Sequence, residues 1–511
     1  MTFSAYQGLR PLYGDLHGHC EVGYGYGAAE EAYRNARTQL DFACVAAHAH
    51  WPDLPGDDPR LPSVVEYHQT GFARAAKLWP RLQEVAESVN EDGRFASFFG
   101  YEWHSMAYGD YNVYHRQPGA PLLYESDLPG LRAALRRLRE EGRQSFLIPH
   151  HIGYRSGYRG LNWQAFSEEF SPVVEILSMH GLAESEDGPY PYLHGMGPRS
   201  SQGTLQHGLA MGKVVGVIGS TDHHAAYPGS YGHGRLAVWA SEPTRAAIWE
   251  AIAARRTYAL TGDRITLAFS IDGRPMGSVL PPTPERHIEV AVAGGGAIDY
   301  VEVLHNNQVI HRSDRLAGGA DSADETVKVL LEVGWGMVGT HVKWEVELEA
   351  VGAELLAVEP RFRGPDVLAP EQGGGSNESV NSWRRLGSSG IGLTAHTWGS
   401  PTGHTPPTQA VCLELRADAG AHLEGRINGQ PFKVGLAELR RGGVTGYLGG
   451  FLAPAYCFHR AVPRADYTLA TSLTHRGGAG RDWYYVRVRQ RNDQWAWSSP
   501  IWVEPMVGGP A

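Results

Sequence analysis

The stretch "YGDLHGHC" places His17 and His19 one residue apart, at the end of a segment with the pattern of a β-strand. Side chains at positions i and i+2 of a strand point to the same side, roughly 6–7 Å apart. That spacing lets two imidazoles converge on one metal ion. An isolated His-x-His pair is more often structural or on the surface, so the rest of the chain must decide between the two interpretations.

Further polar side chains follow the same pattern, each at the end of an apolar run. They are His48 and His50, Glu102 and His104, His150 and His151, His180, and Asp222 with His223 and His224. Fifteen of the 24 histidines fall within residues 17–233. Independent structural histidines have no reason to recur at strand after strand, so the pattern predicts a metal site.

Neutral imidazole and carboxylate are ligands that suit zinc, manganese or iron. The set is larger than one four-coordinate ion can use, so it predicts two or three divalent ions. A carboxylate such as Glu102 offers two oxygens and can bridge two ions. Ions a few ångströms apart can hold a hydroxide between them and polarise a scissile group, which predicts hydrolysis.

The first half of the chain alternates apolar β-like runs with helical patterns, for example "DFACVAAHAH" after "AAEEAYRNARTQL". Such alternation indicates a parallel sheet covered by helices, which fits an open doubly wound sheet or a closed barrel. Candidate ligands at the ends of several strands favour the barrel, because barrel enzymes place their reactive groups there.

From about residue 265 the pattern changes to short strands of period two with Gly, Pro and Asn between them. This predicts an antiparallel β-sandwich. We therefore expect an α/β metallohydrolase domain over 1–264 and all-β structure over 265–511. A long Gly/Pro-rich loop is predicted near 360–405, and the tract 400–480 belongs either to the sandwich or to a second small β unit.

Composition bounds the remaining possibilities. A chain of 511 residues with 42% hydrophobic residues and a formal net charge of −10 is typical of a soluble multidomain protein without a nucleic-acid partner. We expect no signal peptide and no membrane span, because no basic-then-apolar leader and no run of about 18 apolar residues occurs. Four cysteines without CxxC spacing favour a reducing cytoplasm. The sequence is compatible with a homo-oligomer.

Five spaced motifs resemble those of the polymerase and histidinol phosphatase (PHP) superfamily. "DLHGH" resembles its first motif, "AAHAH" stands at its Thr-Asp-His motif, "YEW" at its bridging glutamate, "PHH" at its His-Pro motif, and "STDHH" at its final Asp-x-His. With "GDYNVY" and the closing "WSSPIWV", the chain looks most like the branch that includes carbaryl hydrolases. The resemblance implies a distorted (β/α)7 barrel ahead of the β-sandwich.

Carried over by motif, one metal would be held by His17, His19, Glu102 and Asp222. Glu102 would bridge to a second metal held with His150 and His180, and a third would use His48 and His224. Ala47 replaces the usual motif aspartate, which removes support for the ligands. No histidine follows "HGH" where the superfamily has its next ligand, although Glu21 or His50 could substitute, so a binuclear site is an alternative.

Other residues near these motifs have candidate roles. Strand alternation predicts that His151 and His223 point away from the ligands, while His50 shares the face of His48 and is either a ligand or part of the pocket wall. His104 and His115 are candidate proton donors to a leaving group, with a pocket or supporting role as the alternative.

Loops rich in Tyr and Gly follow the same strands and predict an aromatic-walled cleft. The candidate substrate-binding residues there are Tyr24, Tyr154, Arg155 and Tyr227. Arg155 and Arg159 could clamp a phosphate or carboxylate by paired hydrogen bonds, although surface arginines are common.

The leading hypothesis is a metal-dependent hydrolase in which a metal-bridged hydroxide cleaves an ester-type bond of a small molecule, with Glu102 and Asp222 at the reacting centre. A carboxylic ester, carbamate or amide is slightly favoured over a phosphoester, because the chain has no phosphate loop and no basic excess. The alternatives are a non-catalytic metal-stabilised binding protein and a lyase. Lys77 and Lys213 are the only lysines before residue 264, which disfavours a lyase with a lysine base.

Overall fold

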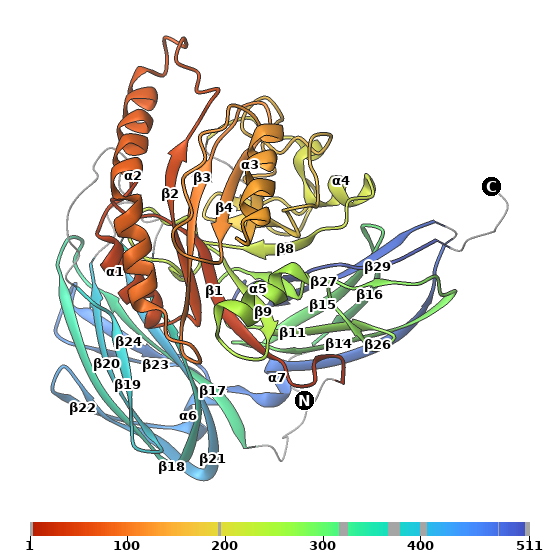
Figure 1. The fold of residues 1–511 in the computed structure, drawn as a ribbon. Helices are drawn as coiled ribbons and strands as arrows, with labels where there is room; N and C mark the ends of the chain where they lie inside the picture. Colours follow the sequence, from red (N-terminus) through yellow and green to blue (C-terminus); the bar gives the residue numbers. More distant parts are fainter. Residues whose placement is uncertain are drawn as a thin grey trace.

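Three parallel strands lie at the centre of the computed structural model, which describes residues 4–192, 196–315, 325–365, 379–398, 406–478 and 480–505. They are β1 (Arg10–Gly18), β2 (Phe42–His50) and β3 (Ala96–Trp103), and they lie side by side (Figure 1). Their residues are almost all buried, as expected for parallel strands covered on both faces. The strand ends predicted to carry ligands therefore meet at one edge.

Antiparallel strands flank this centre. Next to β3 come β4 (Asp110–His115) and β5 (Ser145–His150), and next to β1 come β9 (Arg235–Ala240) and β10 (Thr257–Leu260). The prediction of a parallel sheet thus holds for β1, β2 and β3 but not for β4 and β9, both of which run antiparallel to their neighbours. Fully buried strands of either direction have the same continuous apolar pattern, so the sequence does not distinguish them.

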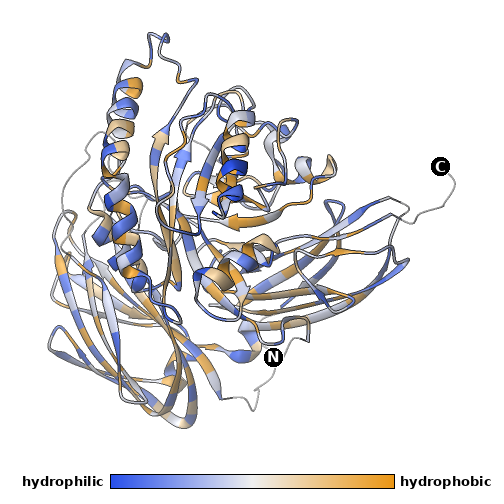
Figure 2. Ribbon diagram, in the orientation of Figure 1, coloured by the Kyte–Doolittle hydropathy of each residue, from blue (hydrophilic) through white to orange (hydrophobic). Residues whose placement is uncertain are grey.

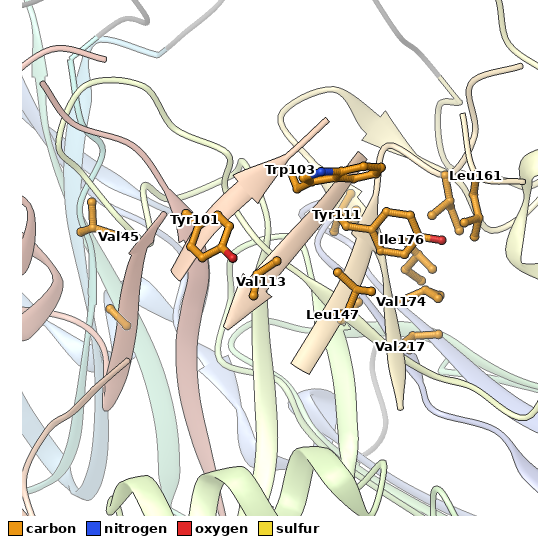
Figure 3. Close-up of a cluster of buried hydrophobic side chains, with 14 of the residues drawn as sticks. Val45, Tyr101, Trp103, Tyr111, Val113, Leu147, Leu161, Val174, Ile176 and Val217 are labelled. Atoms are coloured by element: carbon orange, nitrogen blue, oxygen red, sulfur yellow. The ribbon is translucent and has the colours of Figure 1, made fainter. Parts of the chain in front are cut away.

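A separate small sheet completes the first half of the chain. Its strands are β6 (Val173–Ser178), β7 (Gly181–Leu182) and β8 (Gly216–Gly219), with β6 and β8 parallel. In Figure 3, side chains from strands of both sheets gather in one buried cluster, among them Tyr101, Tyr111, Leu147, Val174 and Val217. This shared core holds the two sheets against each other, so the first half is a mixed α/β structure.

Helices cover the outside of these sheets (Figure 1). The described residues contain α1 (Ala29–Arg37), α2 (Pro62–Val89), α3 (Leu128–Glu140), α4 (Leu205–Ala210), α5 (Arg245–Ala253), and the one-turn α6 (Leu436–Leu439) and α7 (Arg464–Tyr467). Local chemistry explains where some of them begin, because Asp127 and Thr244 accept hydrogen bonds from backbone N–H groups of the first turns of α3 and α5. Among the described residues, no helix has both the length and the apolar character that crossing a bilayer requires.

The second half is built of antiparallel β-structure. One sheet contains β17 (Thr326–Trp335), β18 (Val342–Arg361), β19 (Ser382–Leu386), β20 (Gly390–Thr397), β21 (Thr408–Ile427), β22 (Gln430–Gly435), β23 (Val444–Tyr447), β24 (Pro454–Phe458) and β25 (Val462–Pro463). Another contains β11 (Thr266–Ile271), β12 (Arg274–Pro275), β14 (Glu285–Ala293) and β26 (Thr468–Arg476). Hydrophilic and hydrophobic residues alternate along these strands in Figure 2, as period two predicts.

The prediction of one long loop near 360–405 is wrong for the middle of that segment. Residues 382–397 form the paired strands β19 and β20, because "SWRRL" and "GIGLTAHT" supply residues that alternate across a sheet. The segments 366–378 and 399–405 of this predicted loop lie outside the described residues.

One sheet crosses the predicted boundary at residue 264. β10 pairs with β28 (Trp495–Ser498), and the same sheet continues through β27 (Asp482–Gln490), β29 (Ile501–Val503), β13 (Val279–Leu280), β15 (Ile298–His305) and β16 (Gln308–Asp314). Trp495, Trp497 and Trp502 belong to the same buried cluster as the strands of the first half. The last strands of the chain are thus part of the first half's core.

We predict that residues 1–264 alone do not fold cooperatively. Their removal from the rest of the chain exposes the edge of β10 and uncovers apolar surface that the tryptophans bury. Circular dichroism melts and binding of a hydrophobic dye to the fragment measure this. A fragment that melts in one sharp transition and binds no dye contradicts it.

Candidate metal centre

The end of β1 is tied to the segment that follows β8 by a buried carboxylate. Asp15 accepts hydrogen bonds from the backbone N–H groups of His17 (3.0 Å), Thr221 (3.1 Å) and Gly229 (2.7 Å). This brings His17 and His19 next to Asp222, more than two hundred residues away in the chain. Asp15 is fully buried, and an acid inside an apolar strand is the sequence signal that could have revealed this role.

Glu102 lies at the centre of the cluster. It stands on β3 between Tyr101 and Trp103, which both point into the buried cluster, so strand alternation turns Glu102 to the other face. Five imidazoles approach the two carboxylate oxygens of Glu102. Oε1 contacts His17 Nε2 and lies 3.3 Å from His150 Nε2 and 3.5 Å from His19 Nε2, while Oε2 lies 2.7 Å from His48 Nδ1 and 3.1 Å from His104 Nε2.

Asp222 is the second carboxylate of the cluster. Its backbone has a φ of 54°, in the left-handed region that Asp tolerates better than most residues. Asp222 Oδ1 lies 2.9 Å from His19 Nε2, and Oδ2 lies 3.1 Å from His180 Nε2. His224 Nε2 is 3.2 Å from His48 Nε2, which connects the last predicted ligand to the others.

The structure thus brings together every side chain predicted as a metal ligand. These are His17, His19, His48, Glu102, His150, His180, Asp222 and His224. Among the described residues, neither Glu102 nor Asp222 has a lysine or arginine within ion-pair distance, so the two acids face imidazoles alone.

The protonation of these groups suits divalent cations. Burial would raise the carboxyl pKa values of Glu102 and Asp222, but the surrounding histidines outweigh it and hold both pKa values well below their usual range. Burial lowers the pKa of His150 and of His224 to about 3, so both rings are neutral at pH 7. Ionised carboxylates and neutral imidazoles are the forms that bind zinc or manganese.

Glu175 is a part of the cluster that sequence reasoning missed. Its carboxylate lies 3.1 Å from His17 Nδ1, on the side of the ring away from Glu102. Burial lowers the pKa of His17, but Glu175, Asp222 and Glu102 outweigh it and raise that pKa well above 6.5. A carboxylate behind a ligating imidazole fixes its orientation and raises its basicity. The lone acid in the apolar run "PVVEILS" was the available signal.

Alternation fails for two histidines next to predicted ligands. His151 has a φ of 52°, just beyond the end of β5, and its ring returns to the cluster with Nε2 3.4 Å from Asp222 Oδ2. The prediction that it points away is wrong. His50 leaves the cluster because the pairing of β2 with β3 shifts between His48 and His50, and its ring contacts Tyr124 instead. His223 does point away, toward the carbonyl oxygen of Pro365.

The two predicted proton donors have different positions. His104 lies against Glu102, and its Nδ1 is 3.2 Å from Arg159 Nη2. The prediction for His115 is wrong, because it pairs with Ser145 at the far end of β4, whereas Asp110 pairs with His150 at the cluster. Five residues of strand separate the two positions by about 17 Å. His115 Nδ1 lies 2.8 Å from the Ser145 hydroxyl.

A small pocket of about 140 Å³ opens onto the cluster. It is lined by Tyr24, His48, Tyr67, His68, Glu102, His151, Arg159, Met179, His180, Met196, Asp222 and His224. The Tyr24 ring stacks on His48 with 3.6 Å between ring centroids, so this predicted substrate-binding residue does lie at the site. The Tyr24 hydroxyl lies 3.3 Å from His68 Nε2.

The other substrate-binding predictions are not supported by the pocket lining. Tyr227 is buried in the core of the second half, where its hydroxyl accepts a hydrogen bond from Asn381. Arg155 is exposed and lies over the Tyr158 ring. Tyr154 is buried behind His151, with 5.6 Å between the rings. Of the two arginines expected to clamp an anion, Arg159 lines the pocket and Arg155 does not, since the loop turns at Arg159 with a φ of 70°.

Comparisons with known proteins find uncharacterized relatives. Residues 230–273 match a family model described as a protein of unknown function (DUF3604). An uncharacterized protein of Chlamydia pneumoniae is 26% identical over 253 residues, 46% of this chain and 40% of that protein. One of Chlamydia trachomatis is 27% identical over 331 residues, 56% of this chain and 52% of that protein. The matches thus span about half or less of these relatives' length.

A solved structure from Bacteroides vulgatus, a two-domain protein containing a predicted PHP-like metal-dependent phosphoesterase, is 13% identical. The alignment covers 85% of this chain and 97% of that chain, with a TM-score of 0.32. At that score the likeness carries no argument about fold or function.

We predict that adding Zn²⁺ or Mn²⁺ to the metal-free protein raises its free energy of unfolding. The variant Asp222→Asn is expected to lose most of this increase in stability. A ligand that binds only the folded state at a hundredfold excess over its Kd contributes about 2.7 kcal/mol per site. Asn fits the left-handed backbone but removes the charge that a cation requires. Thermal melts with and without metal measure the gain.

The matched control is His115→Gln, a buried strand substitution away from the cluster. It is expected to lower the baseline Tm and to keep the metal-dependent increment. An equal increment in wild type and Asp222→Asn contradicts the ligand assignment.

Proposed function

We propose that the protein is a metal-dependent hydrolase of ester-type bonds. The observation that carries this proposal is the convergence of two ionised carboxylates and a set of imidazoles at the base of a pocket. Divalent ions held there would activate water and polarise the scissile group. A purely structural metal site is closed by its ligands, whereas this cluster forms a pocket wall.

The ligand residues differ in their access to the pocket. The side chains of His17 and His19 are 0% and 1% exposed, whereas those of His180 and His224 are 16% and 12% exposed. Water and substrate would therefore approach on the side of His180 and His224. His17 and His19 lie on the opposite, fully buried side of the site. There Glu175 contacts the His17 ring, and Asp15 accepts a hydrogen bond from the His17 backbone N–H.

The pocket favours a phosphoester over the neutral ester, carbamate or amide that the sequence slightly favoured. Arg159 lines the pocket, and a guanidinium there attracts an anionic group. The small volume fits the reacting end of a molecule, and Tyr24 and Tyr67 provide aromatic surface for the group attached to it. Tyr24 stays protonated, because burial and then Glu102 raise its pKa well above 10.

His104 supports the site and does not protonate a leaving group in this proposal. It is fully buried and does not line the pocket, and its Nε2 faces Glu102 Oε2. A hydrogen bond at that position orients the carboxylate.

The same proposal extends to the fold. Strands β9, β1, β2, β3, β4 and β5 form one path, and contacts of β5 with β6 and of β8 with β10 continue it. We interpret this ring as the distorted PHP-type barrel, and the antiparallel sheets of the second half as a β-sandwich. The carbaryl-hydrolase resemblance stays a prediction.

A panel of chromogenic phosphomonoesters, phosphodiesters, carboxylic esters and carbamates tests the activity. We expect metal-dependent release from a phosphoester, loss of release on chelation, and recovery when Mn²⁺ or Zn²⁺ is added back. His17→Ala and His19→Ala are expected to lower kcat/KM by more than about 100-fold while the protein stays folded, because supporting groups alone account for 10–100-fold.

His115→Gln again serves as the control and is expected to retain turnover. If chromogen is released only from the carbamate or the carboxylic ester, the proposed substrate class is a neutral ester and not a phosphoester. Full activity of the metal-free protein, or of His17→Ala, would overturn the metal mechanism.

A further inference from the structure

His180 lies at the tip of a tight hairpin. The turn between β6 and β7 has two residues, because Ser178 pairs with Gly181, and the His180 backbone N–H lies 3.2 Å from Ser178 Oγ. β7 has only two residues and forms the edge of its sheet. The position of the His180 ring therefore depends on what holds the chain directly after β7.

Glu184 anchors the chain at that point. Its side chain is fully buried, and its Oε1 accepts a hydrogen bond from the Tyr485 hydroxyl at 2.7 Å and lies 3.2 Å from Arg487 Nη1. Its Oε2 accepts from the Trp497 indole N–H at 2.9 Å. A buried carboxylate requires such partners, because leaving it unpaired costs free energy. All three donors come from β27 and β28, so the last strands of the chain fix the residue that follows the hairpin.

The Tyr485 hydroxyl also holds the first turn of α4. It accepts a hydrogen bond from Gln206 Nε2 at 2.7 Å. The backbone N–H groups of Leu205 and Gln206 donate in turn to the carbonyl oxygens of Ala183 and Glu184, at 2.9 Å and 3.1 Å. One phenol thus joins both sides of this segment to β27.

The ligands on the central strands are positioned differently. His17 is on β1 and Glu102 is on β3, and both strands pair with β2 between them. His180 Nε2 lies 3.1 Å from Asp222 Oδ2, and these two residues form a candidate metal group with His151. The two parts of the cluster share Asp222 but are held by different parts of the chain.

We propose that Glu184 and Tyr485 are positioning residues for the ion that His180 would bind, so that the antiparallel second half of the chain takes part in building the metal centre. This inference rests on the metal centre of the proposed function. The ion in the group of His151, His180 and Asp222 depends on the anchor, whereas an ion held by the ligands of β1 and β3 does not.

The test compares the same substitution at two neighbouring tyrosines of β27, both fully buried. Tyr485→Phe removes the hydroxyl that contacts Glu184 and Gln206. Tyr484→Phe is the matched control, because its hydroxyl lies on the other side of the sheet, 2.9 Å from His475 Nδ1. Each full-length protein is stripped of metal and titrated with Co²⁺, whose visible absorption reports the ligands around the ion.

We expect Tyr485→Phe to weaken the affinity for one ion by about 10-fold and to leave the other affinities unchanged, because buried polar groups of the anchor lose their partner. Tyr484→Phe is expected to lower Tm by a similar amount and to keep every affinity of wild type. Glu184→Gln places an amide NH₂ among three donors, so we expect it to retain one ion fewer than wild type after desalting.

Equal affinities in Tyr485→Phe and Tyr484→Phe, or an equal loss at every ion in Tyr485→Phe, would overturn the inference and leave the proposed function standing. A folded Glu184→Gln that retains every ion, or a single ion in wild type, would do the same. If Glu184→Gln fails to fold, the pair of tyrosine variants still decides. Wild type that binds no Co²⁺ would overturn the proposed function itself.

Discussion

The interaction on which the rest of the structure depends is the approach of two ionised carboxylates, Glu102 and Asp222, inside a shell of imidazoles. Both are buried, and burying a charge without a partner costs several kcal/mol even after the surroundings relax. The surrounding histidines hold both carboxyl pKa values low despite burial, and divalent cations bound between the two acids would offset their negative charges directly. The geometry of the first half of the chain can be understood as the means of holding these two acids in place.

Long-range contacts supply that support. Asp15 joins the end of β1 to the segment carrying Asp222, and Glu175 on β6 fixes the ring of His17. The last strands of the chain contribute as well. Glu184, four residues after His180, accepts hydrogen bonds from Tyr485 (2.7 Å) and from the Trp497 indole (2.9 Å). The ligand-bearing loops therefore depend on residues from both ends of the sequence.

Much of the candidate site could be predicted because parallel strands bring their carboxyl ends to one edge, so a polar residue after each apolar run is informative. What alternation could not predict depends on backbone geometry. The left-handed φ of His151 and the register shift before His50 leave no pattern in the sequence. Arg155 and Arg159 are equivalent in sequence, and only the turn of the loop decides which one reaches the pocket. The antiparallel direction of β4 and β9 was likewise hidden, since buried strands look alike in either direction.

Anomalous diffraction from crystals grown with Zn²⁺ tests the central claim most directly. The account predicts strong peaks between Glu102 and Asp222, at about 2.0–2.2 Å from imidazole nitrogens and carboxylate oxygens. Diffraction that shows no peak there, with the two carboxylates contacting imidazoles alone, would contradict it.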